Sequence, residues 1–386
     1  MKFEAKCNFC LSETEVIYEP KKSLIGLQIL ICKECGFVQS EKSIARDVQP
    51  TTFEIQALSC DSDYSPVRVG KQQMTNVDIG NIEALELDGI VHFEFLDMAS
   101  ARGHFALWAT SKTSKKVVCL EPDQYMIDSY VGQRQIQVHI GDYREVEMTS
   151  VFDFIYSCHT LEHFRNPLDY LNFVYGHLKT DGLFYVNVPN LQGILNVAAF
   201  DDFFYDKHRV YFDPSTLRQV LQSQRFEVIA EWIDEACIRF LARKVDRVDA
   251  STLVSNYRSN HDLITKYKSG LSASRASLPN LVEVLRGRLN PNSTRIILGC
   301  GRMLDALVSY GHLDLNDFDF LVDNYLGVAT RTLYSRDLFT LDSLPTISGQ
   351  LQIIVVARTA NAELGEKIYA KFKTADIVYF ANIASE

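Results

Sequence analysis

Short apolar segments that read as strands alternate with helical segments from about residue 90 onward. The strand-like segments cover residues 91–97, 115–123, 136–143, 152–159 and 182–189, and helical patterns cover 104–112, 124–132 and 166–178. This rhythm predicts a mainly parallel sheet with helices on both faces. We therefore expect an α/β, doubly wound domain, whose ligands bind at the carboxyl ends of the strands near the switch in strand order.

Polar side chains stand where these strands end. Asp97 closes the first strand and Glu121 the second, Asp142 and Tyr143 follow the third, and Ser157 lies at the end of the fourth. An acid at such a place can accept hydrogen bonds from ribose hydroxyls, and an aromatic ring offers a stacking face. The strand ends therefore predict a nucleotide-type cofactor pocket.

The loop after the first strand lacks the glycines of a dinucleotide site. Residues 97–103 read DMASARG, whereas a dinucleotide loop reads G-x-G-x-x-G. The small side chains of Ala99 and Ser100 permit close approach of a ligand to the backbone, and Gly103 can adopt a positive φ. We expect Ala99, Ser100 and Gly103 to contact a cofactor that has no pyrophosphate.

Four of the nine cysteines form two C-x-x-C pairs near the N-terminus, Cys7 with Cys10 and Cys32 with Cys35. Two such pairs predict one tetrahedral site of four thiolates, a donor set that favours zinc. Because four thiolates leave no open position for water, the zinc is expected to be structural. The scattered cysteines lie mostly in apolar segments and are expected to be small core residues.

Composition narrows the classes of partner. The net charge of −10 argues against a nucleic-acid-binding protein, because neutralising phosphates needs a basic face. The N-terminal segment MKFEAKCNFC lacks the apolar core of a signal peptide, and no uninterrupted apolar run approaches the length of a membrane span. We therefore expect a cytoplasmic protein with no membrane or nucleic-acid partner.

The order of these features resembles the class I S-adenosylmethionine-dependent methyltransferases over about residues 90 to 242. It resembles more narrowly the sugar-nucleotide C-methyltransferases, which join a zinc-binding domain, a methyltransferase domain and a C-terminal Rossmann-like domain. Their cofactor loop D-I-A-S-N-D-G is matched at Asp97, Ala99, Ser100 and Gly103. The segments CHTLEHFRNPLDYL (158–171) and FFYDKHRVYFDPSTLRQVL (203–221) also resemble segments of that family.

The resemblance implies S-adenosylmethionine as cofactor and a nucleotide-diphosphate sugar as acceptor. Methylation of a carbon next to a ketone requires a base and a group that stabilises the enolate oxygen. The family's Y-x-E-H-x-x-Y-F segment is matched at Tyr205 and His208, so His208 is expected to be the base, with Tyr205 and His163 assisting. Lys207 stands where the family has glutamate, and residues 101–102 (Ala-Arg) replace Asn-Asp in the cofactor loop.

We expect a zinc-binding domain over residues 1–48, a linker and helical lead-in over 49–89, the methyltransferase domain over 90–244, a helical connector over 245–290 and a second Rossmann-like domain over 291–386. The last domain has a weak NAD-type pattern in Gly299, Gly301 and Asp323, but Leu304 occupies the place of the third glycine. Alternatively, this domain contacts a nucleotide diphosphate through its loop and helix N-terminus, is purely structural, or mediates homo-oligomer formation.

Two other functions stay open from the sequence. One is O- or N-methylation in the synthesis of a surface polysaccharide or natural product, which requires only a base beside a hydroxyl or alignment of an amine. The other is a catalytically degenerate methyltransferase fold that serves as a binding module. The departures at residues 101–102 and Lys207 favour the binding module, whereas Glu121, Asp142 and His208 oppose it.

Overall fold

The computed structural model describes residues 5–21, 26–42, 66–122, 130–196, 202–204, 207–247, 253–324, 326, 332–356 and 368–383. The chain divides into two compact units. The first comprises the described residues of 1–47, 69–196 and 204–266, and the second comprises those of 48–68, 197–203 and 267–386.

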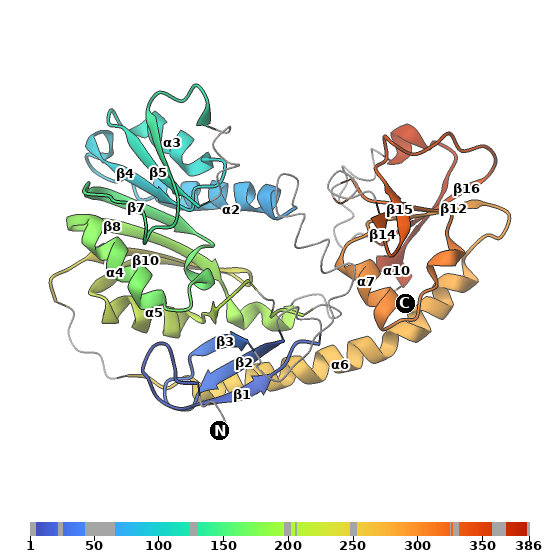
Figure 1. The fold of residues 1–386 in the computed structure, drawn as a ribbon, viewed down its shortest axis with the longest axis horizontal. Helices are drawn as coiled ribbons and strands as arrows, with labels where there is room; N and C mark the ends of the chain where they lie inside the picture. Colours follow the sequence, from blue (N-terminus) through green and yellow to red (C-terminus); the bar gives the residue numbers. More distant parts are fainter. Residues whose placement is uncertain are drawn as a thin grey trace. The chain divides into compact units, whose positions relative to one another are not determined.

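A seven-stranded sheet forms the centre of the first unit, and its strands are labelled in Figure 1. Its spatial order is β10-β11-β8-β7-β4-β5-β6. The strands are β4 (Phe95–Met98), β5 (Val117–Glu121), β6 (Ile136–Ile140), β7 (Phe152–Cys158), β8 (Leu178–Pro189), β10 (Phe226–Ile233) and β11 (Cys237–Lys244). All pairings are parallel except those of β11, which runs antiparallel to both β8 and β10. The sheet confirms the prediction of an α/β fold.

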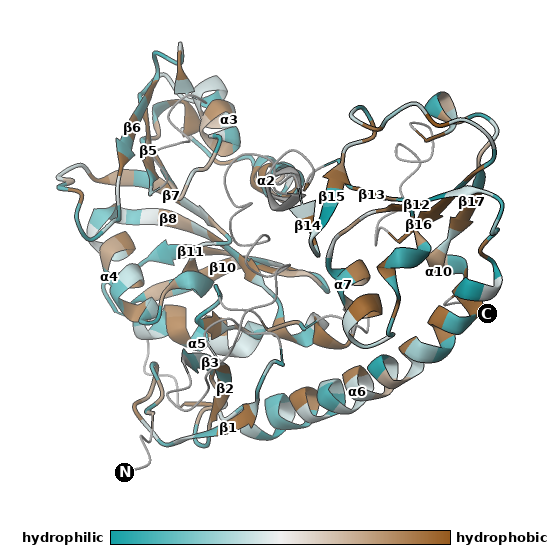
Figure 2. Ribbon diagram, turned by 45° about the vertical axis from the view of Figure 1, so that its right-hand side comes forward, coloured by the Kyte–Doolittle hydropathy of each residue, from teal (hydrophilic) through white to brown (hydrophobic). Residues whose placement is uncertain are grey.

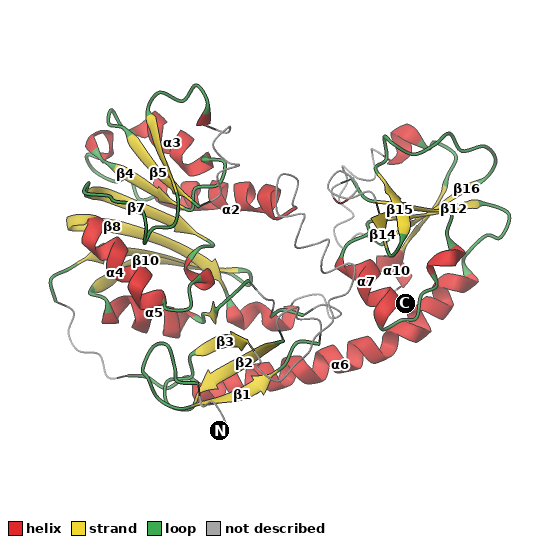
Figure 3. Ribbon diagram, viewed as in Figure 1, coloured by secondary structure: helices red, strands yellow, loops and turns green. Residues whose placement is uncertain are grey.

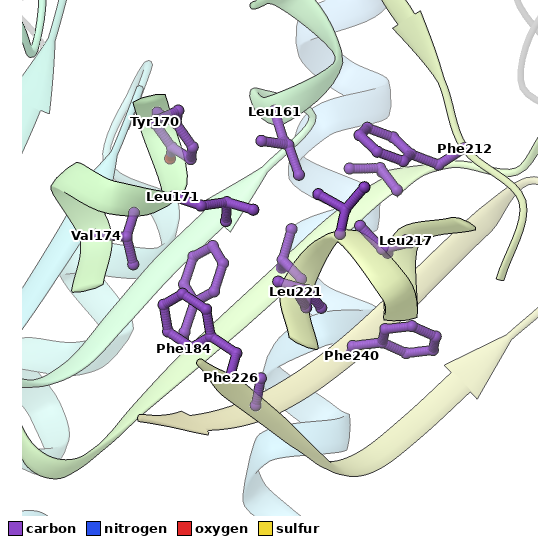
Figure 4. Close-up of a cluster of buried hydrophobic side chains, with 14 of the residues drawn as sticks. Leu161, Tyr170, Leu171, Val174, Phe184, Phe212, Leu217, Leu221, Phe226 and Phe240 are labelled. Atoms are coloured by element: carbon purple, nitrogen blue, oxygen red, sulfur yellow. The ribbon is translucent and has the colours of Figure 1, made fainter. Parts of the chain in front are cut away.

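Helices cover both faces of this sheet (Figure 3). One face is covered by α4 (Pro167–His177) and α5 (Pro214–Ser223), whose side chains pack on the strand residues Phe184, Phe226 and Phe240 (Figure 4). The other face contacts α2 (Pro66–Glu83) and α3 (His104–Lys112) through a second buried cluster that contains Phe95, Phe105 and Tyr156. The predicted helix over residues 124–132 falls mostly on residues outside the described ranges.

The strand order reverses at β4 and β7. From β4 the chain proceeds through β5 to β6 on one side, whereas β7 and β8 lie on the other side. In open α/β sheets, ligands bind outside the carboxyl ends of the strands at such a switch point. The loop after β4 and the 3-10 turn after β7 (Leu161–His163) are therefore the first places to look for a site.

A second sheet in this unit contains the N-terminal strands. It consists of β1 (Thr14–Tyr18), β2 (Leu27–Cys32), β3 (Val38–Lys42) and β9 (Val210–Tyr211), in that spatial order. Strand β9 comes from the segment that was expected to contain catalytic residues, and Val38 pairs with Tyr211 across the β3–β9 ladder. The N-terminal segment and the segment around His208 therefore share one sheet.

The second unit contains a sheet of order β14-β15-β13-β12-β16-β17. Its strands are β12 (Thr294–Leu298), β13 (Phe320–Val322), β14 (Thr332–Leu333), β15 (Arg336–Phe339), β16 (Leu351–Val355) and β17 (Asp376–Tyr379). Its pairings are parallel except that between β14 and β15. Helices α7 (Arg302–Ser309) and α10 (Phe380–Ile383) contribute to its core.

The long helix α6 (Tyr257–Gly287) lies within the segment that was expected to be a helical connector. Its turns alternate between hydrophilic and hydrophobic colours in Figure 2, as expected of an amphipathic helix. Shorter 3-10 turns cover Ile90–His92, Leu191–Asn196 and Leu315–Asp317. Across the described ranges, no helix combines the length and the apolar character needed to cross a bilayer.

Candidate functional site at the switch point

The loop after β4 has an unusual backbone. Ala99 and Ala101 both have φ 49°, and Gly103 has φ 70° at the N-terminus of α3. Glycine adopts this left-handed region without a penalty, whereas holding any other residue there costs about 1–3 kcal/mol of folding free energy. Two alanines of the loop, Ala99 and Ala101, are therefore held in a strained left-handed backbone conformation. They lie in the place where a nucleotide-type loop contacts its ligand.

Two side chains brace this loop from the neighbouring segments. The Tyr130 hydroxyl donates to the carbonyl of Ala101 at 2.6 Å and lies 2.7 Å from Ser100 Oγ. Glu121, at the end of β5, accepts the N–H of Ala101 through Oε2 at 2.5 Å. A carboxylate offers about four acceptor sites, so a carboxylate at this place can accept more than one donor.

The contact between Tyr130 and the loop explains why residue 103 is glycine. A Cβ built on Gly103 would lie 2.5 Å from Tyr130 Cε1, closer than real Cβ contacts come. The small residues Ala99, Ser100 and Gly103 therefore form a tight loop that Tyr130 packs against, and their contact with the cofactor stays a prediction.

The remaining predicted cofactor residues lie at the same edge of the sheet but in different environments. Asp97 is buried at the end of β4, and the buried hydroxyl of Ser157 accepts a hydrogen bond from Tyr170 at 2.8 Å. Asp142 accepts two bonds from the Arg144 guanidinium, at 2.7 Å each, and these hydrogen bonds lower the pKa of Asp142. Tyr143 is buried.

The ring of Tyr143 packs edge-on against Phe164, Tyr170 and Phe173, with centroid distances of 5.0 to 5.4 Å. Burial raises the pKa of its hydroxyl. In this structure Tyr143 is therefore part of the aromatic core beneath the site, and its role as a stacking face for the cofactor stays a prediction.

The four cysteines of the two C-x-x-C pairs converge. The Sγ atoms of Cys7 and Cys35 are 3.7 Å apart, and Cys10 Sγ lies 3.4 Å from Cys32 Sγ and 3.5 Å from Cys35 Sγ. Thiolates around one zinc ion at about 2.3 Å would be about 3.8 Å apart. The N–H groups of residues 9 and 10 point at Cys7 Sγ. The donor set therefore fits a tetrahedral zinc ion.

The turn after Cys35 requires glycine. Gly36 has φ 76°, and a Cβ there would lie 2.3 Å from the carbonyl carbon of Asn256, just before α6. Asn260 donates to the Gly36 carbonyl at 3.0 Å. The cysteine cluster is therefore packed directly on the first turns of α6.

A second group of potential ligands lies after β7. The buried carboxylate of Glu162, 1 % exposed, has His159 Nδ1 at 3.3 Å and His208 Nε2 at 3.9 Å from Oε1. The His163 and His208 rings lie with their centroids 5.0 Å apart. One ligand atom each from Glu162, His163 and His208 lie within 4.8 Å of one another. The structure therefore brings His163 and His208 together around an acid, Glu162, that the sequence did not point to.

Backbone contacts fix the two segments that meet in this cluster. Arg209 N–H donates to the Glu162 carbonyl at 2.7 Å. Ser40, on β3, donates through Oγ to the His208 carbonyl at 2.8 Å and through its N–H to the Arg209 carbonyl at 2.9 Å. Strand β3 of the N-terminal sheet therefore holds His208 in place. Tyr205 lies outside the described residues.

Glu162 does not follow from the family motif, because the motif Y-x-E-H-x-x-Y-F has its acid directly before the histidine, where Lys207 stands in this chain. The acid instead comes from a turn more than 40 residues earlier in the chain. Its signal in the sequence is slight: Glu162 directly precedes His163, one residue past the buried Leu161, in the turn that follows a strand end. The Arg209 N–H to Glu162 carbonyl bond, at 2.7 Å, joins this turn to the segment that contains His208.

The NAD-type loop of the second unit is braced in a similar way. Asp323 accepts the N–H groups of Cys300 and Leu326 at 2.8 and 2.9 Å. Gly299 has φ 97°. These contacts account for Asp323 as a residue that holds its own loop, so nothing in them specifically favours NAD.

The sequence profile of a methyltransferase domain family matches residues 73–231. No curated protein matches the chain. Solved structures similar to it include an S-adenosylmethionine-dependent methyltransferase from Clostridium acetobutylicum, with 14% identity, a TM-score of 0.37 and coverage of 48% of this chain and 94% of that one. Another is the 1,6-didemethyltoxoflavin-N1-methyltransferase from Burkholderia thailandensis, with 15% identity, a TM-score of 0.38 and coverage of 54% and 96%.

These structural likenesses are too slight to argue from, and the identification rests on the domain match. That match begins in α2, spans the loop after β4 and the cluster after β7, and ends in β10. Residues 73–231 therefore contain a methyltransferase domain, and this match supports an S-adenosylmethionine-dependent methyltransferase enzyme.

Proposed function

We propose that the enzyme methylates a carbon next to the keto group of a nucleotide-linked sugar. The observation that carries the proposal is the meeting of His163 and His208 in the region that follows β7, with their ring centroids 5.0 Å apart. The end of β7 pairs with the end of β4, where the proposed cofactor loop begins, through Ser157 and Met98. In this proposal His208 removes the proton from the acceptor carbon, and Tyr205 and His163 stabilise the enolate oxygen.

The cofactor pocket in this proposal consists of residues at four strand ends: Asp97, Ala99, Ser100, Gly103, Glu121, Asp142, Tyr143 and Ser157. S-adenosylmethionine supplies a methyl group on a positively charged sulfur. Glu121 would accept ribose hydroxyls, while the loop backbone approaches the methionine portion. Asp142 would have to exchange part of its contact with Arg144 for the cofactor, which an exposed ion pair permits at little cost.

We also propose that Cys7, Cys10, Cys32 and Cys35 hold a structural zinc ion. Three of the four cysteines are buried, and the cluster packs in the same core as Phe37 and Phe212, close to the segment that contains His208. Zinc would thus stabilise the sheet that positions His208. Metal analysis of the purified protein tests this proposal, which predicts one zinc ion per chain.

We propose a cytoplasmic location.

The identity of the proposed acceptor is tested by comparing three candidate acceptors. The enzyme is incubated with S-adenosylmethionine and a nucleoside-diphosphate keto sugar, the free keto sugar, or the corresponding nucleotide sugar with a hydroxyl in place of the ketone. The proposal predicts methyl transfer to the first acceptor only, with the new methyl bonded to carbon by NMR. In D₂O, His208→Ala should lose exchange of the proton next to the ketone.

A second candidate is O-methylation of a sugar hydroxyl. The observation that favours it is the contact of His208 with the Glu162 carboxylate, because a hydroxyl needs only one base to remove its proton. In the same panel this candidate predicts transfer to the hydroxyl sugar and a methyl resonance on oxygen. If the protein binds the cofactor but transfers the methyl group to none of the three acceptors, both candidate functions are contradicted.

A further inference from the structure

We propose that Glu162, His163 and His208 bind a divalent cation of the first transition series at the carboxyl end of β7. This site is separate from the four cysteines. Binding of the cation does not depend on the identity of the acceptor. Its use, which is to hold the acceptor through an oxygen atom, rests on the proposed function.

The donor atoms are of the right kind and lie close together. Two imidazoles and one carboxylate are a recurrent ligand set for divalent iron and related metals, and three protein ligands leave positions open for a substrate. Ligands around an ion at about 2.1 Å are about 3 to 3.5 Å apart. The observed atoms lie within 4.8 Å of one another, with 3.9 Å between Glu162 Oε1 and His208 Nε2. Side-chain movements of less than about 1 Å would bring the ligand atoms to these separations.

The hydrogen bond of His163 prepares its ring for binding a metal. His163 Nδ1 lies 3.1 Å from the Lys207 carbonyl, which can only accept, so Nδ1 carries the proton. In a neutral imidazole, Nε2 then has the lone pair. A metal-binding histidine commonly donates its other N–H to a backbone carbonyl in this way.

The charge of the set also favours a cation. Glu162 is 1 % exposed, and its carboxylate faces His159 as well as His208. Removing a carboxylate from water is costly unless a positive charge lies close by. A divalent cation would supply that charge at the atoms that already converge.

The backbone holds the ligands from both sides before any cation arrives. The Arg209 N–H to Glu162 carbonyl bond joins the two segments, and Ser40 fixes the His208 carbonyl. Leu161 and Phe212, both fully buried, anchor the same segments in the core shown in Figure 4. Such support favours tight binding, because few ligand motions remain to be frozen.

With a cation bound, the part played by His208 in the proposed reaction changes. Its ring nitrogen would then hold the cation, and the cation would bind the acceptor's keto or hydroxyl oxygen and make the neighbouring proton more acidic. A base other than His208 would have to accept that proton. Acceptors that offer such an oxygen, alone or as a chelating pair with a neighbouring hydroxyl, form the substrate class that this site would select.

Manganese is the probe for the test. Full-length protein loaded with zinc at the cysteines is titrated with Mn²⁺, and free Mn²⁺ is measured by electron paramagnetic resonance; thiolates prefer zinc, so manganese should not displace it. We expect one Mn²⁺ per chain. Glu162→Gln, His163→Ala and His208→Ala should each weaken binding by more than about a hundredfold, since losing even an outer-shell partner costs about 10- to 100-fold.

His261→Ala is the matched control, because His261 is an exposed histidine on α6 with Asp262 beside it at 3.7 Å. It should bind Mn²⁺ like the wild type. Zinc content and S-adenosylmethionine affinity verify that each variant is folded. Wild-type protein that binds the cofactor but no Mn²⁺ would overturn the proposal, and so would Mn²⁺ binding that all three ligand variants retain.

A second measurement needs no variant. Pulsed electron paramagnetic resonance of wild-type protein with Mn²⁺ should detect two directly bound imidazole nitrogens, and the absence of nitrogen coupling would overturn the site. These readouts are independent of turnover. Protein that binds Mn²⁺ at these residues but methylates no keto sugar refutes the proposed acceptor alone. Methylation of that sugar by protein without a second cation refutes the use of the cation in the reaction, whereas the binding site itself is refuted by the Mn²⁺ measurements.

Discussion

Replacing Gly103 with alanine tests the account of the loop after β4 most sharply. Alanine at φ 70° costs about 1–2 kcal/mol, and its Cβ would meet Tyr130 Cε1 at 2.5 Å. The Tyr130 ring must move by about 1 Å to restore ordinary contact. Its hydroxyl would then lose one of its bonds to Ala101 or Ser100, each worth about 0.5–1.5 kcal/mol.

A less flexible unfolded chain offsets about 0.4–1 kcal/mol of this loss. We therefore expect Gly103→Ala to lower the free energy of unfolding by about 1–3 kcal/mol. Because each 1.4 kcal/mol is a factor of ten, affinity for S-adenosylmethionine should fall about tenfold or more if the strain is released in the loop. Urea unfolding and calorimetric titration measure the two quantities.

Ala101→Gly is the matched control. Ala101 also has a left-handed backbone, with φ 49°, and glycine keeps the N–H that Glu121 accepts. Its free energy of unfolding should not fall, because relief of about 1–3 kcal/mol of backbone strain matches or exceeds the loss of about 0.4–1 kcal/mol from the greater freedom of the unfolded chain. Its cofactor affinity should stay near that of the wild type. Unchanged stability and unchanged affinity in Gly103→Ala would refute the reasoning.

Three further predictions concern other parts of the first unit. Cys10→Ser should lower the zinc content measured by elemental analysis from one ion per chain to less than one and should lower the melting temperature, because three thiolates hold zinc less well than four. Asp78→Ala should lower the free energy of unfolding, measured by urea titration, by about 3–5 kcal/mol, because it removes a fully buried carboxylate bonded to Arg239 at 2.8 Å. Burial opposes ionisation of Asp234, but the hydrogen bonds from Arg239 and two backbone N–H groups lower its pKa below the ordinary value. Its stabilisation is therefore present above the ordinary pKa of aspartate, about 3.9, and is lost as the pH falls through the lowered pKa. The stability deficit of Asp234→Asn at pH 7 should therefore vanish once the pH lies below that lowered pKa.

Much of the central sheet could be predicted from local pattern. The alternation of apolar segments anticipated β4, β5, β6, β7 and β8, because strands buried between helices read as short apolar runs. The strand-end residues Asp97, Glu121 and Asp142 followed from that prediction, since each directly ends or follows a strand. Their hydrogen-bond partners did not, because Tyr130 and Arg144 are placed by the fold of the loops.

The site after β7 depends on distant parts of the chain. Glu162 meets His208 because the Arg209 N–H bonds to the Glu162 carbonyl, and β9, the two-residue strand that follows, leaves no recognisable pattern in sequence. The left-handed Ala99 and Ala101 were equally hidden, since alanine does not signal a positive φ. Tertiary contacts hold these residues against their local preference.

The most direct test of the central claim is calorimetric titration of zinc-loaded protein with S-adenosylmethionine and, separately, S-adenosylhomocysteine. We predict micromolar binding that Glu121→Ala abolishes, because the variant loses the acceptor for the ribose and the brace on Ala101. Glu235→Ala, which removes an exposed acid in the turn between β10 and β11, should bind like the wild type. No detectable heat up to millimolar ligand, in protein with full zinc content, would contradict the assignment of the loop after β4 as the cofactor site.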